Sequence, residues 1–237
     1  IIVKISEFYN SFVDVYNQSA LLRGAIAGIG FQFETLFIVA KLAFKNIWAY
    51  IKTAGSNMIN LFQPALGQEE LDAISEVFRS NWIGQGPKVR EFESNFAASL
   101  EEKADYFLST TSCTEAIFLA ADIFEFSSND EVIVPSISFP SVGSAVLKSG
   151  AKMVLCDVEP RSLNVRAEDI EKAITPYTKA VFITHYGGVP CDMDPIVNLC
   201  NEYNIYLIED TACAVRSFYK GKACGTFGDM GMWSFDA

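Results

Sequence analysis

The 237-residue sequence contains a single histidine and lacks several motifs that define common enzyme classes. A serine hydrolase would have to use His185 as its base, but no G-x-S-x-G turn accompanies it. No G-x-G-x-x-G run follows an expected strand, and no G-x-x-x-x-G-K-[ST] run occurs. These absences remove the main sequence support for a hydrolase, a dinucleotide-dependent enzyme and a P-loop NTPase.

Basic residues are also scarce, because 18 lysines and arginines face 29 acids, which gives a formal charge of −11. Nucleic-acid binding needs a basic surface, so we expect small-molecule partners and no nucleic acid. The chain has no C-x-x-C pair, which argues against a structural zinc site and predicts no bound metal. We expect a cytoplasmic protein with six reduced thiols, at Cys113, Cys156, Cys191, Cys200, Cys213 and Cys224.

The charge divides unevenly along the chain. Residues 1–57 carry five basic and three acidic residues, a net charge of +2, which leaves −13 for the remainder. Over residues 34–52 the charged positions fall on one narrow stripe of a predicted helix, so most of its surface is apolar. Such a helix requires burial in a partner, a neighbouring helix pair or a membrane interface, although it is not a clean transmembrane span. We expect residues 1–57 to form a helical N-terminal arm of unknown role that is foreign to the domain that follows.

From residue 58 to residue 237, helical and strand patterns alternate along the sequence. Strands separated by helices of this length form βαβ units, so we predict an α/β fold with a mostly parallel sheet flanked by helices. A glycine-rich hairpin is expected after the last strand. The expected helices lie at 68–79, 88–100, from 109–114 onward, 141–148, 167–174 and 194–203, and the expected strands at 106–108, 131–134, 152–156, 180–184 and 205–210.

Three candidate binding features follow expected strands at their carboxyl ends, where parallel sheets bind ligands. Asp210 ends the strand that starts at residue 205, although position alone makes a turn or helix-cap role equally plausible. The hydroxyl-rich run 110–114 opens a helix whose N-terminus favours an anion, but such residues also cap helices without a ligand. Phe139 follows the strand 131–134, and a lone phenylalanine is more often a core residue.

Taken together, a phosphate cradle, an aromatic plate and a carboxylate for a ring nitrogen are what pyridoxal phosphate requires. From Met58 onward the chain resembles the DegT/DnrJ/EryC1/StrS family of pyridoxal-phosphate-dependent sugar aminotransferases. The resemblance implies the aspartate aminotransferase type I fold, with an incomplete large cofactor-binding domain at 58–237 and without the family's small C-terminal domain. It rests on ordered motifs at 81–87, 92–93, 130–136, 185–188, 192–194, 209–210, 219–222 and 228–229.

The resemblance also implies roles for particular residues in holding the cofactor. Asp210 would pair with the protonated ring nitrogen and keep the ring an electron sink, while Phe139 would stack on the ring. Backbone N–H groups and a hydroxyl at Ser112, Cys113 and Thr114 would hold the phosphate. The family usually has glycine where Cys113 stands, which bears on how closely the backbone approaches the phosphate.

Further implied roles concern residues around this centre. Ser234 would add a second hydroxyl for the phosphate, and Trp82 would lie near the substrate mouth. Cys213 would contact the cofactor from a place that usually holds glutamine, or histidine in the dehydratase branch. His185 would lie in a strand-end loop on the substrate side, with a structural role favoured over general-base catalysis. Arg216 replaces a residue that is usually small.

The implied reaction transfers an amino group, typically from glutamate, to a nucleotide-linked keto-sugar in polysaccharide or amino-sugar biosynthesis. In the family the catalytic lysine would lie two residues past Ala237, so we predict no catalytic residue within this chain and an inactive fragment. Two alternatives stay open, namely a pyridoxal-phosphate-dependent sugar dehydratase of the same family and a non-catalytic regulatory or scaffold relative. The resemblance also implies a homodimer.

Overall fold

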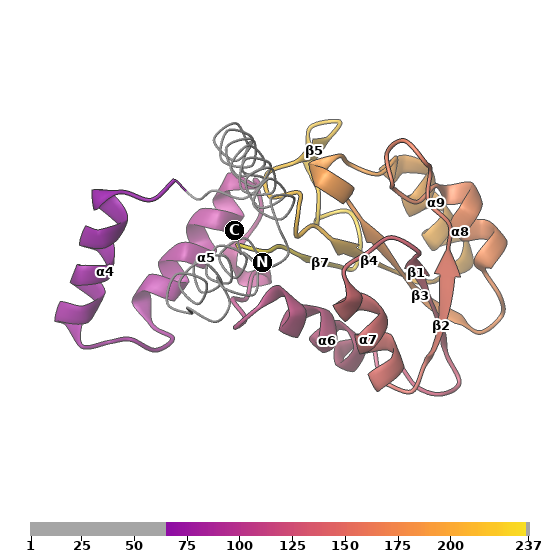
Figure 1. The fold of residues 1–237 in the computed structure, drawn as a ribbon, viewed down its shortest axis with the longest axis horizontal. Helices are drawn as coiled ribbons and strands as arrows, with labels where there is room; N and C mark the ends of the chain where they lie inside the picture. The colour runs from indigo at the N-terminus through magenta and orange to yellow at the C-terminus, as the bar shows by residue number, and fades with distance from the viewer. Residues whose placement is uncertain (1–64, 236–237) are drawn as a thin grey trace, which may run out of the picture. The chain divides into compact units, whose positions relative to one another are not determined.

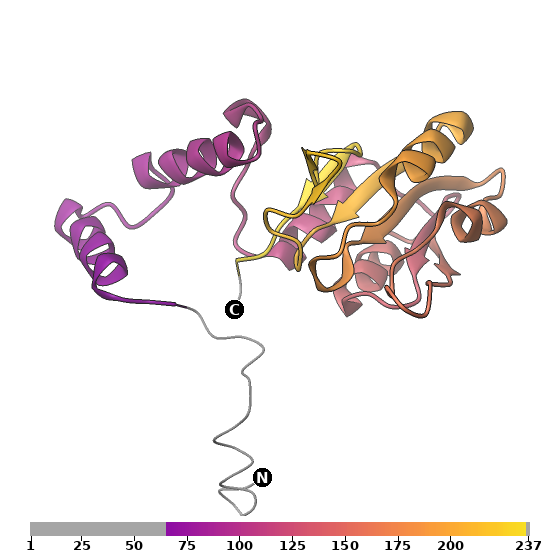
Figure 2. The ribbon, with the colours of Figure 1, turned by 90° about the horizontal axis from the view of Figure 1, so that it is seen from above.

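The computed structural model describes residues 65–235, which belong to the compact unit Ala65–Ala237. The predicted arm at 1–57 and the predicted boundary at Met58 lie outside the described residues. Figures 1 and 2 show the described part as a sheet with helices on both sides, preceded by further helices. Within residues 65–235 no helix is both long and apolar enough to cross a membrane.

A five-stranded sheet forms the centre of the fold, in the order β2-β1-β3-β4-β7, with every neighbouring pair parallel. Its strands are short and mostly buried, because helices cover both faces. The order reverses at β1, which lies between β2 and β3, and such a reversal opens a crevice at the carboxyl ends of the strands. The strands are β1 (Glu131–Pro135), β2 (Lys152–Cys156), β3 (Thr178–Thr184), β4 (Tyr206–Asp210) and β7 (Met230–Met232).

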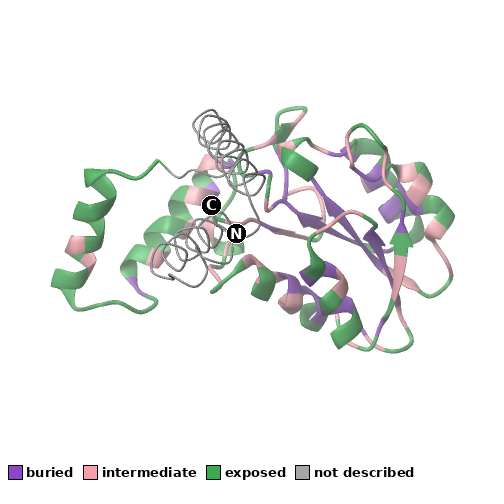
Figure 3. Cartoon of the chain, viewed as in Figure 1, coloured by how far each residue is buried: buried purple, intermediate pink, exposed green. Residues whose placement is uncertain are grey.

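Two helical layers enclose the sheet and divide the core into two clusters. On one face, α6 (Cys113–Ile123) and α7 (Pro140–Lys148) pack on alternate strand residues that include Phe182 and Ile208. On the other, α8 (Ala167–Ala173) and α9 (Met193–Tyr203) pack on the intervening residues, among them Ile183 and Leu207. Figure 3 shows the buried positions concentrated in the strands and on the inner sides of these helices. The predicted α/β fold with a mostly parallel sheet is confirmed.

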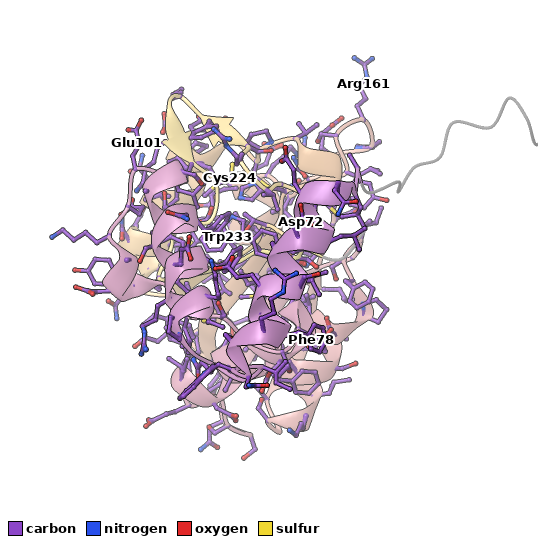
Figure 4. All side chains as sticks on the ribbon, turned by 90° about the vertical axis from the view of Figure 1, so that its left-hand side faces the viewer. Asp72, Phe78, Glu101, Arg161, Cys224 and Trp233 are labelled. Atoms are coloured by element: carbon purple, nitrogen blue, oxygen red, sulfur yellow. The ribbon has the colours of Figure 1, made fainter. Side chains whose placement is uncertain are left out.

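Two helices precede this core, and they differ in burial. Helix α4 (Gln68–Ser80) has no buried residue, and the side chains of Asp72 and Phe78 that Figure 4 labels belong to it. Helix α5 (Pro87–Ser99) is followed by a single helical turn, η1 (Ala104–Tyr106), and presents Phe92 and Phe96 to aromatic side chains near the C-terminal end of the chain. These contacts tie α5 to the strand β7 and the residues after it.

Most predicted elements agree with the structure, and two details do not. No strand forms at 106–108, because this segment has no ladder partner and Phe107 stacks instead on Trp233, with ring centroids 5.5 Å apart. The strand predicted from residue 205 begins one residue later as β4, and Tyr206 at its start is 42% exposed and contacts Phe124. The predicted hairpin is present as β5 (Phe218–Tyr219) and β6 (Lys222–Ala223).

Candidate cofactor site

A cavity of about 1090 Å³ opens at the carboxyl edge of the sheet. Its wall combines residues from α5, the segment 106–112, the length of α6, Phe139 and Ser141 at the start of α7, the end of β4, and the segment from Gly225 to Phe235 without Phe227. These parts are far apart in sequence and meet because parallel strands bring their carboxyl ends to one edge. Six residues predicted to bind the cofactor line this cavity, namely Ser112, Cys113, Thr114, Phe139, Asp210 and Ser234.

Four acidic residues line the cavity, namely Glu93, Glu102, Asp210 and Asp229, and of these Asp210 is the buried one, with only 2% exposure. One carboxylate oxygen, Oδ1, accepts a hydrogen bond from the backbone N–H of Ala212 at 3.1 Å. This is a turn-type contact, but a carboxylate has about four lone-pair positions, so acceptor capacity remains for a ligand. Burial raises the pKa of Asp210, while the hydrogen bond from the Ala212 N–H acts in the opposite direction. A cationic ligand group would therefore supply the charge that this carboxylate needs.

The N-terminus of α6 forms the second part of the site. Ser112 is the N-cap, and its Oγ accepts a hydrogen bond from the backbone N–H of Glu115 at 3.1 Å. The Glu115 carboxylate in turn accepts a hydrogen bond from the backbone N–H of Thr111 at 2.9 Å. The first N–H groups of a helix have no acceptor within the helix, and here they open beside the cavity. This end of α6 is suited to an anion.

Phe139 lies where an aromatic plate was predicted, immediately before α7. Its side chain is 63% exposed, which excludes the alternative that it is a core residue. An exposed phenylalanine beside a buried carboxylate offers a flat apolar surface to a ring-shaped ligand.

Three buried polar atoms on the cavity wall have no hydrogen-bond partner, namely Ser109 Oγ, Ser141 Oγ and Trp233 Nε1. Leaving such groups unpaired costs free energy, and a polar ligand in the cavity would supply the missing partners. The sequence did not point to any of the three as site residues. Ser141 directly follows Phe139-Pro140 and could have been found from that spacing, whereas Ser109 and Trp233 become wall residues only through packing.

An aromatic cluster forms the part of the wall that joins α5 to the end of the chain. Phe96 contacts both Trp233 and Phe235 edge-on, with centroid distances of 5.4 and 5.2 Å. The adjacent Glu93 accepts a hydrogen bond from the backbone N–H of Ser109 at 2.7 Å. The predicted motif at 92–93 therefore shapes the cavity, which sequence reasoning had not assigned to it.

Three other predicted residues do not line the cavity. His185 is completely buried, and Trp82 is exposed with its Nε1 donating to the Gln85 carbonyl at 3.0 Å. Cys213 is exposed in the turn after β4. In this chain His185 has a structural place in the core, and neither Trp82 nor Cys213 contributes to the cavity wall. Arg216 is also exposed and off the wall, so it does not crowd the cavity.

The six cysteines are all free thiols and give a direct test of this geometry. Burial raises the pKa of Cys113, Cys156 and Cys224 to about 11, and that of Cys191 and Cys200 to about 12. Because the thiolate is the nucleophile, a pKa raised from 9 to 11 lowers the reactive fraction roughly a hundredfold at pH 8. We expect Cys213 alone to react rapidly with a disulfide reagent such as DTNB at pH 8.

The control for the thiol measurement is the variant Cys213→Ser, which should lose the fast phase while unfolding releases the five remaining thiols. A second fast thiol in the native protein would contradict the burial of the other five thiols.

Comparison with known proteins identifies relatives of this chain. The chain is 52% identical over 180 residues to dTDP-4-dehydro-2,3,6-trideoxy-D-glucose 4-aminotransferase of Saccharopolyspora spinosa, covering 76% of this chain and 47% of that protein. It is 36% identical over 178 residues to GDP-perosamine synthase of Escherichia coli O157:H7, with 75% and 48% covered. The chain therefore spans about half the length of the curated relatives it matches.

A solved structure shows the same fold. The aminotransferase TlmJ from Streptoalloteichus hindustanus superimposes with a TM-score of 0.74 at 48% identity, covering 76% of this chain and 49% of that one. The profile of the DegT/DnrJ/EryC1/StrS aminotransferase family matches residues 64–237, which include every cavity-lining residue. The chain belongs to the DegT/DnrJ/EryC1/StrS aminotransferase family.

Proposed function

We propose that this chain is the cofactor-binding part of a pyridoxal-phosphate-dependent sugar aminotransferase, with residues 58–237 as its large domain. The observation that carries the proposal is the buried carboxylate of Asp210 in a cavity that also holds a helix N-terminus and an exposed phenylalanine. A related protein of Streptococcus pneumoniae was solved in its PLP form, and it is 26% identical with a TM-score of 0.66, covering 76% of this chain and 49% of that one. The presence of this cofactor in a related structure supports the proposal.

Each part of the cavity would hold a different part of the cofactor. Asp210 would accept a hydrogen bond from the protonated ring nitrogen, and Phe139 would cover one face of the ring. Ser112, Cys113 and Thr114 at the start of α6 would bind the phosphate through backbone N–H groups and the Thr114 hydroxyl. Ser234 lies on the same wall and would add a hydroxyl to this set. When bound, the cofactor supplies an electron sink for the carbon that exchanges its amino group.

The chain's own residues would set the conditions for this chemistry. Burial of Asp210 keeps water from competing for its carboxylate, so the negative charge acts on the ring nitrogen with little screening. The unpaired hydroxyls of Ser109 and Ser141 would complete their hydrogen bonds on the bound ligand. We propose a nucleotide-linked keto-sugar as the acceptor and glutamate as the donor, in polysaccharide or amino-sugar biosynthesis. We also propose a cytoplasmic homodimer.

The test uses the complete protein that contains this chain, purified with pyridoxal phosphate. Incubation with glutamate and a dTDP- or GDP-linked 4-keto-6-deoxy sugar should give the amino sugar together with 2-oxoglutarate, both detected by mass spectrometry. Formation of a 3-deoxy-4-keto sugar and free ammonia together with 2-oxoglutarate, with no amino sugar, would assign a dehydratase instead, because removal of the hydroxyl oxygen requires the two electrons that glutamate supplies. Failure of the protein to bind the cofactor at all would favour a non-catalytic relative.

A further inference from the structure

Glu209 lies beside Asp210 in β4 but points to the opposite face of the sheet, because successive strand residues alternate. Its side chain is completely buried. The oxygen Oε1 accepts hydrogen bonds from the backbone N–H groups of Phe227 at 2.6 Å and Gly228 at 2.7 Å. The oxygen Oε2 accepts one from Gly225 N–H at 2.7 Å and lies 3.1 Å from His185 Nε2.

The hydrogen bonds of His185 determine which ring nitrogen carries the proton. The backbone N–H of Cys191 donates to Nδ1 at 3.0 Å, so Nδ1 must be the unprotonated acceptor. Nε2 therefore carries the hydrogen and donates it to Glu209. Among residues 65–235 no lysine or arginine forms an ion pair with Glu209, so this buried carboxylate depends on four N–H donors. Charge-assisted hydrogen bonds of this kind are the stronger class.

The segment that Glu209 binds is irregular and forms part of the cavity wall. It connects β6 to β7, and Gly225, Thr226 and Gly228 all line the cavity. Gly225 has a φ of +90°, and a Cβ placed on it would lie 2.2 Å from Trp233 Cζ2. The Trp233 ring thus packs directly on the backbone that Glu209 holds, and Trp233 joins the aromatic wall.

We infer that Glu209 is a positioning residue of the cofactor site, which sets the 225–228 wall and, through Gly225, the position of Trp233. This inference rests on the proposed function, because the wall matters only if the cavity holds the cofactor. Glu209 itself does not reach the cavity, since it lies on the face opposite to Asp210 and is not among the lining residues. It acts through the backbone that its two oxygens bind.

The substitution Glu209→Gln tests this role sharply. A glutamine has nearly the same shape, but its amide nitrogen is a donor and must face either Phe227 and Gly228 or Gly225 and His185. In either orientation the N–H donors of the glutamine amide face other N–H donors, so the 225–228 loop must move away. In the complete protein we expect the dissociation constant of pyridoxal phosphate, followed by fluorescence, to rise at least about tenfold, the effect of losing roughly one such contact.

Glu131→Gln provides a matched control at the other end of the sheet. Glu131 is also buried, and its oxygens pair with Lys152 Nζ and Thr175 Oγ1, both at 2.6 Å, away from the cavity. This variant should have a lower unfolding midpoint than the wild type. Its dissociation constant for the cofactor should stay within about twofold of the wild-type value, a change smaller than the loss of one hydrogen bond would cause. Equal weakening by both variants would overturn the inference, because it would show a general loss of stability.

Amide exchange in the wild type gives a second measurement that needs no variant. Adding pyridoxal phosphate should slow exchange at Gly225, Phe227 and Gly228, because a wall that belongs to the site is stabilised by the ligand. Unchanged exchange at these amides, or wild-type affinity in Glu209→Gln, would overturn the inference. A wild-type protein that binds no cofactor would instead overturn the proposed function, so the two failures are distinct.

Discussion

Asp210→Asn should leave the protein folded and lower its turnover as an aminotransferase by at least about a hundredfold, the scale of losing one preorganised electrostatic group. Asparagine has the same shape, and its Oδ1 can still accept the hydrogen bond from Ala212 N–H. What it lacks is the negative charge that would keep the ring nitrogen protonated, so the cofactor would lose its electron-sink character. Turnover of the complete protein with glutamate and the keto-sugar, with cofactor affinity determined separately, measures this loss.

The same substitution has a pH-dependent effect on stability in the absence of cofactor. Burial raises the folded-state pKa of Asp210, so ionisation costs the folded state free energy. Below about pH 4, the pKa of an aspartate in the unfolded chain, this cost is absent. It grows as the pH rises from that value to the higher pKa of Asp210 in the folded protein. Asp210→Asn removes the cost, so its unfolding free energy should equal or exceed that of the wild type at pH 7, and the advantage should vanish below about pH 4.

Asp169→Asn is the control with the opposite sign. The pKa of Asp169 is lowered by hydrogen bonds from Arg166 and Lys172, so its ionised form stabilises the fold above the unfolded pKa. This variant should therefore be less stable than the wild type at pH 7 and match it in acid.

An Asp210→Asn protein that retains wild-type turnover would contradict the role proposed for the Asp210 carboxylate.

Gly231→Ala should destabilise the protein by about 3 kcal/mol, the upper range for an overpacked site. A Cβ on Gly231 would lie 2.0 Å from the carbonyl oxygen of Gly225 and 2.6 Å from its carbonyl carbon. Both are backbone atoms, so no side-chain rotation can relieve the conflict. Gly231 lies in β7 opposite Glu209, and a shift there would disturb the wall that Glu209 holds. Thermal unfolding should show a midpoint lower by roughly ten degrees.

Gly84→Ala is the control, because a Cβ at Gly84 would meet no atom within 4 Å and its φ is not in the left-handed region. Its midpoint should stay close to that of the wild type. Equal midpoints for the wild type and Gly231→Ala would show that β7 and the 225–228 wall do not pack as closely as described.

The repeating pattern of the chain was enough to predict the sheet and its helices, and the failures are local. Helical spacing of apolar residues predicted α4, α7 and α9 to within a residue or two of their observed ends. The prediction of a strand at 106–108 was wrong, because Phe107 packs on Trp233, more than a hundred residues later in the chain, and the segment has no strand partner. No local pattern carries information about such a contact.

The candidate site was likewise predicted only in part. Asp210, Phe139 and the start of α6 could be predicted, because each directly follows a strand or opens a helix, and parallel strands end at one edge. The interpretation of Asp210 as a turn residue was partly right, since it does accept the Ala212 N–H. Trp82 and Cys213 were predicted from resemblance alone, and the cavity does not include them.

By itself, the sequence determined the family, the alternation of strands and helices and the edge at which a ligand would bind, because all of these follow from residue order and local spacing. Only the tertiary structure decided what the neighbouring acids Glu209 and Asp210 do. Asp210 faces the cavity, whereas Glu209 is buried and accepts hydrogen bonds from three backbone N–H groups and a histidine ring. The direction of a strand side chain, and the donors that meet it, depend on segments that are distant in the chain and close only after folding.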